Sequence, residues 1–206
     1  KKGDSLPGLP AHLWDLFPDR LVPSELGEIP EGWDIVRLGD VSDLNWGDTN
    51  VTKKSYVRDG YTAFSAKGPD GFLPYYDYDR TAVVLSAIGE NSGLTWLAQG
   101  KWSCIKNTMR FWSIDESLPT EYLFYATCNK LFWPLRGSAQ PFISQQDARN
   151  TFIIKPISQL SKSFGDIVKP LHTKLFYVSD ENKILAAIRD ILLPKLITGK
   201  ISMKNS

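Results

Sequence analysis

The pattern of apolar and polar positions changes twice along the chain and divides it into three segments. Residues 1–32 carry five prolines between short apolar pieces, and so many prolines preclude a long helix there. Residues 33–156 contain short apolar runs separated by turn-forming residues, which is typical of β-strands. From residue 157 to residue 193 the apolar residues recur mostly at three- and four-residue steps, which predicts a helix, and the segment ends with a tail to residue 201.

The middle segment is predicted to form a small mixed β-sheet with one or two helices. Its strand-like runs are Asp34–Arg37, Tyr61–Phe64, Thr81–Ser86, Leu94–Leu97, Met109–Trp112 and Thr151–Ile154. Turns are predicted at Arg58–Gly60, Gly68–Gly71, Asn91–Gly93 and Gln99–Gly100. A helix is predicted over Glu121–Asn129, with Thr120 as its N-cap.

The last segment is predicted to form one long helix. About 35 residues at 1.5 Å per residue would span roughly 50 Å, which exceeds the usual globular helix and favours coiled-coil-like pairing. Pro170 lies inside the pattern, so we expect a kink or a break near Leu171. Together the segments predict an α+β fold, in which a small mixed sheet with a few helices precedes a long C-terminal helix.

Composition and charge narrow the class of protein. With 206 residues, a net charge of +1 and 42% hydrophobic residues, the chain has a globular rather than a disordered composition. The charge argues against non-specific coating of nucleic acid, but it leaves room for a locally basic face. No apolar run approaches the ~20 residues of a membrane span. Cys104 and Cys128 form neither a disulfide framework nor a zinc motif, so a reducing cytoplasm is expected.

The sequence offers little for catalysis. Only His12 and His172 could serve as a histidine base, and both are expected to be solvated or packing residues. No nucleophile elbow, phosphate-binding loop or zinc-protease motif occurs. The two glycines of Ile88–Gly93 do not form a dinucleotide fingerprint, and the acidic residues are scattered. An enzyme that acts alone is therefore not expected, and neither is a metal site.

Several loops of the middle segment have the chemistry of a DNA-binding surface. They are Ser65–Gly68, Lys106–Thr108 with Arg110, and Arg136–Ser144 followed by Gln145, Gln146 and Arg149. Arg reads guanine O6 and N7, Gln and Asn read adenine N6 and N7, and Ser or backbone N–H groups hold phosphates. Each loop taken alone is also compatible with a solvated turn.

Three stretches resemble one known family. Glu25–Trp33 followed by Val36–Val41 resembles the start of a target recognition domain in the specificity subunit of type I restriction–modification systems. Gly137–Pro141 with Ile143, followed by Ile154–Pro156, is similar to the end of that domain. Glu181–Ile201 resembles the family's helical spacer and its tail. The three occur in the family's order and spacing, and the resemblance covers nearly all of residues 13–201.

The resemblance implies one half of a subunit that carries two recognition domains and two long helices. Residues 1–32 would be a lead-in from the central region, 33–156 the recognition domain, and 157–201 the spacer helix and tail. Leu16–Leu21 before Ser24–Gly27 looks like the junction to the second half, which implies the C-terminal half. Because the chain begins with Lys1, we expect a fragment or a processed product. A natural half-length subunit that dimerises is the other possibility.

The resemblance also implies a non-catalytic protein of DNA methylation and phage defence in the cytoplasm of a bacterium or archaeon. Its expected partners are double-stranded DNA, methyltransferase (modification) subunits, a restriction subunit, and either the N-terminal half of the specificity subunit or a second copy. S-adenosylmethionine, ATP and Mg²⁺ are expected on the partner subunits, and no cofactor is expected on this chain.

The base-reading positions are chosen by chemistry, because recognition domains of the family diverge in sequence. The DNA-binding candidates are Lys67, Asn91, Lys106, Asn107, Arg110, Arg136, Gly137, Ser138, Gln140, Gln145, Gln146 and Arg149. The cations are expected on phosphates or guanines, the amides on base edges, and Gly137 and Ser138 near the DNA backbone.

The helical stripe supplies the candidates for subunit packing, and its first members could instead pack on their own domain. The stripe begins at Leu160, and the subunit-interface candidates are Phe164, Ile167, Leu171, Leu175, Val178, Leu185, Ile188, Leu192 and Leu196.

Two alternatives stay open. A protein-binding module without DNA contact would show a large apolar patch in place of a continuous basic face. A nuclease or methyltransferase fragment would show a metal-binding acidic cluster or an S-adenosylmethionine pocket, and the sequence has motifs for neither.

Overall fold

A computed structural model describes residues 9–200. Residues 1–8 of the predicted lead-in and Ile201 of the predicted tail lie outside this range. The chain divides into two compact units, Lys1–Ile167 and Val168–Ser206. A single long helix, α5 (Ser158–Ile197), crosses the boundary between them.

Between residues 9 and 32 the structure has short elements and no long helix, as the prolines predict. Helix α1 (Ala11–Trp14) is followed by a hairpin of β1 (Leu21–Ser24) and β2 (Gly27–Pro30). The hairpin turn uses Gly27 in the left-handed region (φ +96°), where a Cβ is disfavoured.

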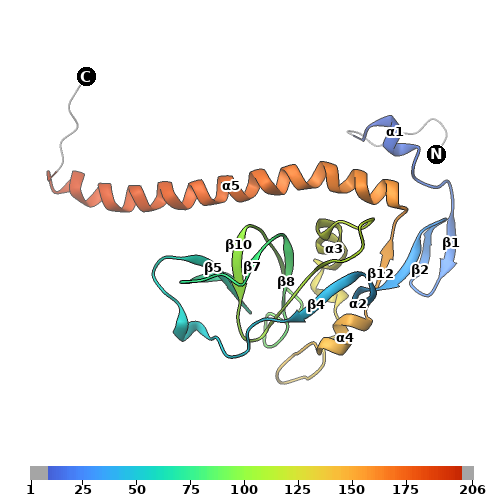
Figure 1. Cartoon of the computed structure of the whole chain (residues 1–206), viewed down its shortest axis with the longest axis horizontal. Helices are drawn as coiled ribbons and strands as arrows, with labels where there is room; N and C mark the ends of the chain where they lie inside the picture. The colour runs from blue at the N-terminus through green and yellow to red at the C-terminus, as the bar shows by residue number, and fades with distance from the viewer. Residues whose placement is uncertain (1–8, 201–206) are drawn as a thin grey trace. The chain divides into compact units, whose positions relative to one another are not determined.

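Two four-stranded sheets form the body of the first unit (Figure 1). The first sheet, with strand order β4-β11-β8-β9, is antiparallel throughout. The second, with order β6-β5-β10-β7, contains the parallel pair β5–β10, so the predicted mixed sheet is confirmed. The bounds are β4 (Ser42–Trp46), β5 (Tyr61–Ser65), β6 (Gly68–Leu73), β7 (Tyr78–Asp79), β8 (Ala82–Ser86), β9 (Thr95–Ala98), β10 (Lys101–Cys104) and β11 (Thr108–Ser113).

A separate two-stranded sheet joins β3 (Asp34–Arg37) to β12 (Phe152–Lys155), the first and last strands of the body. The remaining helical elements are α2 (Leu38–Val41), η1 (Lys53–Ser55), α3 (Thr120–Thr127), η2 (Lys130–Phe132) and α4 (Gln145–Asn150). Gly39 lets α4 pack closely on α2, because a Cβ at Gly39 would lie 2.9 Å from the Cβ of Arg149.

Each face of the first sheet has its own core. Leu44, Phe111 and Leu85 are fully buried in a cluster that includes Leu123 of α3. On the other side, Val84 joins a cluster with the buried Trp102 of the second sheet. Burying a large apolar side chain contributes about 1.5–3 kcal/mol, so these two clusters hold the sheets and helices together.

Every predicted strand and helix is present in the structure, but β1, β2, β4, β6, β7 and β10 were not predicted. Three predictions need correction. Thr120 is not the N-cap of α3; Pro119 holds that position, and the Thr120 hydroxyl instead accepts a hydrogen bond from Ser113 N. The turn predicted at Gly68–Gly71 is the start of strand β6. A break near Leu171 is wrong, because α5 continues through Pro170 as one uninterrupted helix (Figure 1). Pro170 has no N–H to donate to the carbonyl of Asp166, but both residues are exposed, so water can donate a hydrogen bond to that carbonyl instead.

Candidate nucleic-acid interface

Backbone hydrogen bonds join the loops at one end of the two sheets. Ala87 N donates to Asn107 O (2.9 Å), Ile143 N donates to Ala87 O (2.8 Å), and Gly89 N donates to Pro141 O (2.8 Å). Ile105 N donates to Phe64 O at the end of β5 (2.9 Å). We call the surface made by residues 64–68, 86–93, 104–108 and 134–143 the loop edge. It gathers loops that lie up to about 80 residues apart in the sequence.

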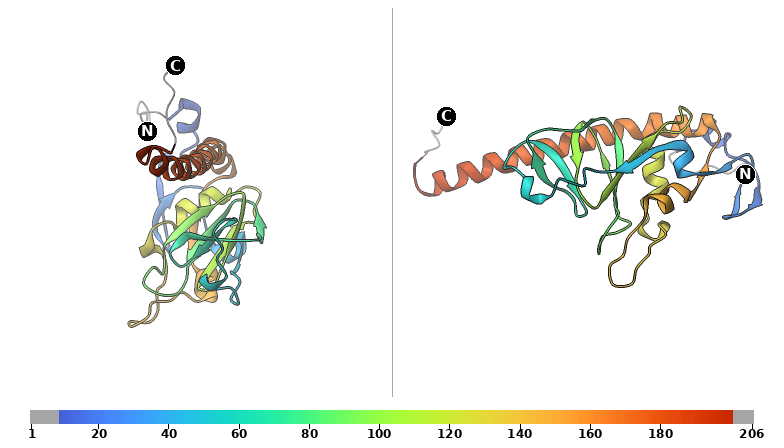
Figure 2. Two further views of the ribbon diagram at one scale, coloured as in Figure 1. Left: turned by 90° about the vertical axis from the view of Figure 1, so that its left-hand side faces the viewer. Right: turned by 60° about the horizontal axis from the view of Figure 1, so that its bottom comes forward.

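The 134–143 loop extends away from the sheets (Figure 2). It is narrowed by paired backbone bonds between Arg136 and Phe142, of 2.9 and 2.8 Å. Gly137 has φ +77°, and a Cβ there would lie 2.7 Å from Gln140 O, so this position requires glycine. Arg136, Ser138 and Gln140 are all exposed on the loop. The sequence-predicted candidates of this segment therefore face solvent together.

An ion pair ties this loop to α4. The Arg136 guanidinium contacts Asp147 Oδ1 at 2.6 Å, and Ser144 Oγ donates to Asp147 Oδ2 at 2.6 Å while it caps the helix. The Ser144 hydroxyl and the Arg136 charge hold the pKa of the Asp147 carboxyl below its usual value. Asp147 thus stays ionised and keeps the base of the loop in place.

The 104–108 turn places Lys106 and Asn107 at the same edge. Asn107 has φ +73°, the only positive φ of a non-glycine residue among residues 9–200, and asparagine tolerates this region better than most side chains. Lys106 is exposed and Asn91 is half-buried in the neighbouring 89–93 turn. Lys67 is exposed on the β5–β6 turn. The loop edge therefore presents amide and ammonium groups side by side.

The free positive charges of this end are lysines. Within residues 9–200, Lys54, Lys67 and Lys106 form no ion pair, whereas Lys53 pairs with Asp70. Lys54 was not among the sequence-predicted candidates. The Lys53–Lys54 doublet beside a turn was the sequence signal that could have identified it. The segment lies near Lys106, because Lys106 N donates to Val51 O (3.2 Å).

Gln145 and Arg149 bind the free edge of β4, the outermost strand of the first sheet. Gln145 Nε2 donates to Leu44 O (3.1 Å) and to Asn45 Oδ1 (3.2 Å). Arg149 Nη2 donates to the same two oxygens, at 2.7 and 3.2 Å. Gln146 is exposed and lies outside this network. Sequence reasoning missed Asn45, because its role depends on a contact across 100 residues.

Arg110 is placed between the sheets rather than on the surface. Only 11% of its side chain is exposed, and Nη1 lies 3.0 Å from Asp43 Oδ1 and donates to Asp43 O at 2.9 Å. Its guanidinium stacks on Trp112 (4.1 Å to the ring centre) and Nε donates to Tyr78 OH (3.3 Å). Of the twelve DNA-binding candidates, Arg110 is the one that the fold turns inward.

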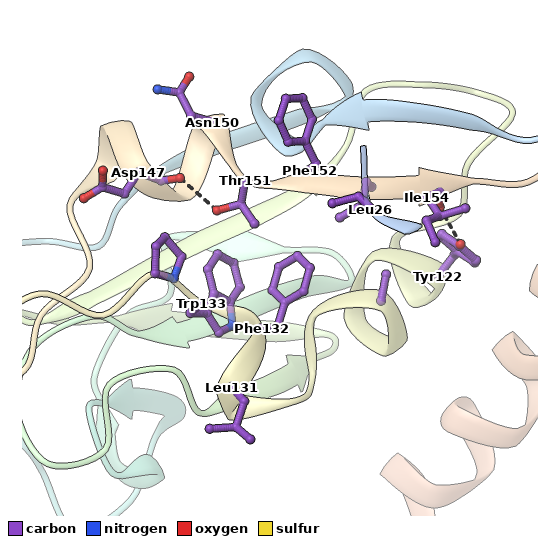
Figure 3. A pocket seen from close by; sticks show the side chains of 13 residues that line it. Leu26, Tyr122, Leu131, Phe132, Trp133, Asp147, Asn150, Thr151, Phe152 and Ile154 are labelled. Atoms are coloured by element: carbon purple, nitrogen blue, oxygen red, sulfur yellow. Dashed lines mark hydrogen bonds between the residues drawn. The ribbon is translucent and has the colours of Figure 1, made fainter. Parts of the chain in front are cut away.

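A separate apolar cleft of about 830 Å³ lies between α3, η2 and β12 (Figure 3). Most polar side chains of its lining are already engaged: Tyr122 OH donates to Ile154 O (2.6 Å), Thr151 Oγ1 donates to Asp147 O (2.8 Å) and Asp147 pairs with Arg136. Among the described residues of the lining, the Asn150 amide is left as a single free polar group. Beside the cleft, Leu131 is 88% exposed. The cleft therefore lacks the convergent free polar groups that orient a small-molecule substrate. In the described part of the chain, no group of three or more His, Cys, Asp or Glu could hold a metal ion.

The apolar stripe of α5 divides into two parts. In the first unit Phe164 packs edge-to-face against Tyr122 and Tyr125, with ring centres 5.9 and 5.7 Å apart, and Leu160 is buried. Ile167 is half exposed. In the second unit the other interface candidates are all exposed: Leu171, Leu175, Val178, Leu185, Ile188, Leu192 and Leu196. No helix of the described residues is both long and apolar enough to span a membrane.

Comparison with known proteins supports the resemblance. No family model matches the chain. The type I restriction enzyme MjaIX specificity subunit of Methanocaldococcus jannaschii is 23% identical over 202 residues, which cover 86% of this chain and 46% of that protein. The chain thus spans about half the length of this curated relative.

Solved structures agree on the fold. The S subunit of a type I restriction–modification system from M. genitalium superposes with a TM-score of 0.63 at 16% identity, over 81% of this chain and 46% of that one. The HsdS subunit of Thermoanaerobacter tengcongensis gives a TM-score of 0.50 at 17% identity, over 92% of this chain and 49% of that one. The chain therefore has the fold of one half of a type I specificity subunit.

Proposed function

We propose that this chain is the DNA-recognition half of a type I restriction–modification specificity subunit, without catalytic activity of its own. Its first unit binds one half of a bipartite target in double-stranded DNA. Its long helix assembles with the other half of the subunit or with a second copy. The methyltransferase and restriction subunits bind to that assembly and carry S-adenosylmethionine, ATP and Mg²⁺.

The observation that carries this proposal is the loop edge. Candidate residues from the 64–68, 86–93, 104–108 and 134–143 segments are joined there by backbone hydrogen bonds. The surface combines unpaired lysines, which attract phosphates, with exposed amides that match base edges. The similarity to a specificity subunit over 86% of the chain supports the same reading.

The second unit supports the assembly part of the proposal. An exposed helix with this many apolar residues is stable in water only when a partner covers the stripe. A coiled-coil partner helix suits its length and spacing. Phe164, which packs on Tyr122 and Tyr125 within the first unit, would then have a different role from the exposed apolar residues of the second unit.

A protein-binding module without DNA contact is the competing proposal, and one observation favours it. The cleft of Figure 3 and the exposed Leu131 form an apolar surface on the first unit, which adjoins the loop edge at Pro134. Apolar surfaces of this kind often mark protein contacts. The two proposals differ in whether lysines of the loop edge control binding to DNA.

The test uses the complete specificity subunit that contains this chain, co-purified with its modification subunits and titrated with duplex DNA. Lys67→Ala with Lys106→Ala should lower the affinity for DNA and flatten its dependence on salt. The matched control, Arg58→Ala with Lys101→Ala, removes the same charge at the opposite ends of β5 and β10 and should leave both unchanged. Equal effects of the two pairs, or no DNA binding by the folded complex, would favour the protein-binding proposal.

A further inference from the structure

A closed hydrogen-bond network determines which atoms of Gln145 remain available. Its amide nitrogen carries two hydrogens, and both are used, one on Leu44 O and one on Asn45 Oδ1. The amide oxygen accepts no hydrogen bond from the described residues and is not among their buried unpartnered atoms. Gln145 Oε1 is therefore open to solvent as the free end of the side chain.

The orientation of each amide in this network is fixed by a partner with only one hydrogen-bonding role. Leu44 O is a backbone carbonyl that can only accept, so the Gln145 atom beside it must be the nitrogen. Arg149 can only donate, so the Asn45 atom 3.2 Å from it must be the oxygen. Asn45 Nδ2 then donates to the Asp43 carboxylate at 2.5 Å, which can only accept. The three assignments agree with one another, and none allows an amide to be turned over.

The network is anchored in the interior. Asp43 is held by the buried Arg110, which is itself stacked on Trp112. Asn45 lies on the edge strand β4, and its side chain joins the partly buried Arg110–Asp43 ion pair to the two α4 side chains. The α4 side chains are thus positioned by the sheet rather than by solvent.

We infer that Gln145 reads DNA as an acceptor only, and that Asn45 is the positioning residue that imposes this role. In the major groove adenine N6 and cytosine N4 are donors, whereas guanine and thymine present acceptors at O6, N7 and O4. A free glutamine could donate or accept, but Gln145 has no donor left. It should therefore select an adenine or a cytosine at one position of the half-site. This inference rests on the proposed function and deepens it.

Arg149 complements this assignment. Both hydrogens of Nη2 are used on Leu44 O and Asn45 Oδ1, which leaves the donors of Nη1 and Nε. Residues 145 and 149 are four positions apart on one helix, so their free groups lie on the same face. The free donors of Arg149 suit a phosphate or a purine N7 beside the amino group that Gln145 contacts.

The test measures base preference rather than affinity alone. The complete specificity subunit, in complex with its modification subunits, is mixed with duplexes randomised over the target, and the bound DNA is sequenced. Wild-type protein should prefer adenine or cytosine at one position by about tenfold, the scale of a lost base contact. Gln145→Met should remove that preference and leave other positions unchanged. Gln159→Met, which changes an exposed glutamine at the start of α5 that is not a DNA-binding candidate, should leave every position unchanged.

Asn45→Ala tests the positioning role. It frees one hydrogen of Gln145 Nε2, so guanine and thymine should become acceptable at that position while the DNA contact itself remains. The double variant Asn45→Ala with Gln145→Met should show the same preferences as Gln145→Met alone, because the two residues act through one atom. Urea unfolding checks that each variant is folded.

The outcomes distinguish a failure of the inference about Gln145 from a failure of the proposed function. Selective DNA binding in which Gln145→Met changes no position, or a wild-type preference for guanine or thymine at the affected position, would overturn this inference and leave the proposed function standing. Failure of the folded wild-type complex to bind DNA selectively would overturn the proposed function and the inference with it.

Discussion

Replacing Arg110 tests whether it supports the fold or contacts DNA. Its side chain donates to Asp43 O at 2.9 Å, pairs with the Asp43 carboxylate at 3.0 Å and stacks on Trp112 at 4.1 Å. Hydrogen bonds to charged groups contribute about 1.5–3 kcal/mol. A cation on an aromatic face adds about 0.5–2 kcal/mol.

These values set the expected loss for Arg110→Ala. The Asp43 side chain is 35% exposed, so water hydrates the carboxylate that is left behind and the cost stays below that of a fully buried broken pair. We expect a loss of about 3 kcal/mol in the free energy of unfolding. For a protein of this size that loss lowers the melting temperature by roughly 6–12 °C.

The assay is urea unfolding followed by tryptophan fluorescence, with DNA binding measured on the same variant. Arg80→Ala is the control, because the exposed Arg80 stacks on the same Trp112 ring at 4.3 Å. It should cost about 0.5 kcal/mol. A loss below about 1 kcal/mol for Arg110→Ala, together with a flatter salt dependence of DNA binding, would refute this reasoning.

Three further predictions concern other parts of the chain. The Lys155 ammonium lowers the pKa of the Asp115 carboxyl to about 2, below its unfolded value of 3.8. The stability that this ion pair contributes is therefore present above about pH 4 and is lost as the pH falls toward 2. Asp115→Asn should therefore flatten acid unfolding in that window, and an unchanged acid profile would contradict this. Gly137→Ala should destabilise by about 1–2 kcal/mol in thermal unfolding, because its φ of +77° is strained for any side chain; an unchanged melting temperature would argue against the loop geometry. Phe164→Ala should lower the free energy of unfolding by about 2 kcal/mol. Leu185→Ala should change self-association, measured by analytical ultracentrifugation, and should leave the unfolding of the first unit unchanged. The reverse result would contradict the division of the apolar stripe.

The sequence predicted the long helix and half of the strands of residues 9–200, because these elements depend on local periodicity. All six strand-like runs are strands in the structure, within a residue or two at their ends. It missed β1, β2, β4, β7 and β10. It also missed β6, where Gly68, Pro69 and Gly71 resemble a turn. Gly71 is required there by packing instead, since a Cβ at that position would lie 2.0 Å from the Tyr56 ring.

The candidate site was predictable in its residue types but not in its arrangement. Arg136 and Gln140 could be selected because cations and amides cluster beside glycine in that loop. Nothing local distinguishes the exposed Lys106 from the buried Arg110, which lies four residues later and faces between two sheets. The role of Asn45 could not be predicted for the same reason, because its partners Gln145 and Arg149 lie about 100 residues later in the sequence.

Hydrogen exchange measured with and without target DNA tests the central claim most directly. On the complete specificity subunit with its modification subunits, bound DNA should slow exchange in residues 86–93, 104–108 and 136–149. It should leave the opposite end of the second sheet, around Tyr61 and Lys101, unchanged. Protection at Tyr61 and Lys101 in place of the loop edge, or at the apolar cleft alone, would contradict the account.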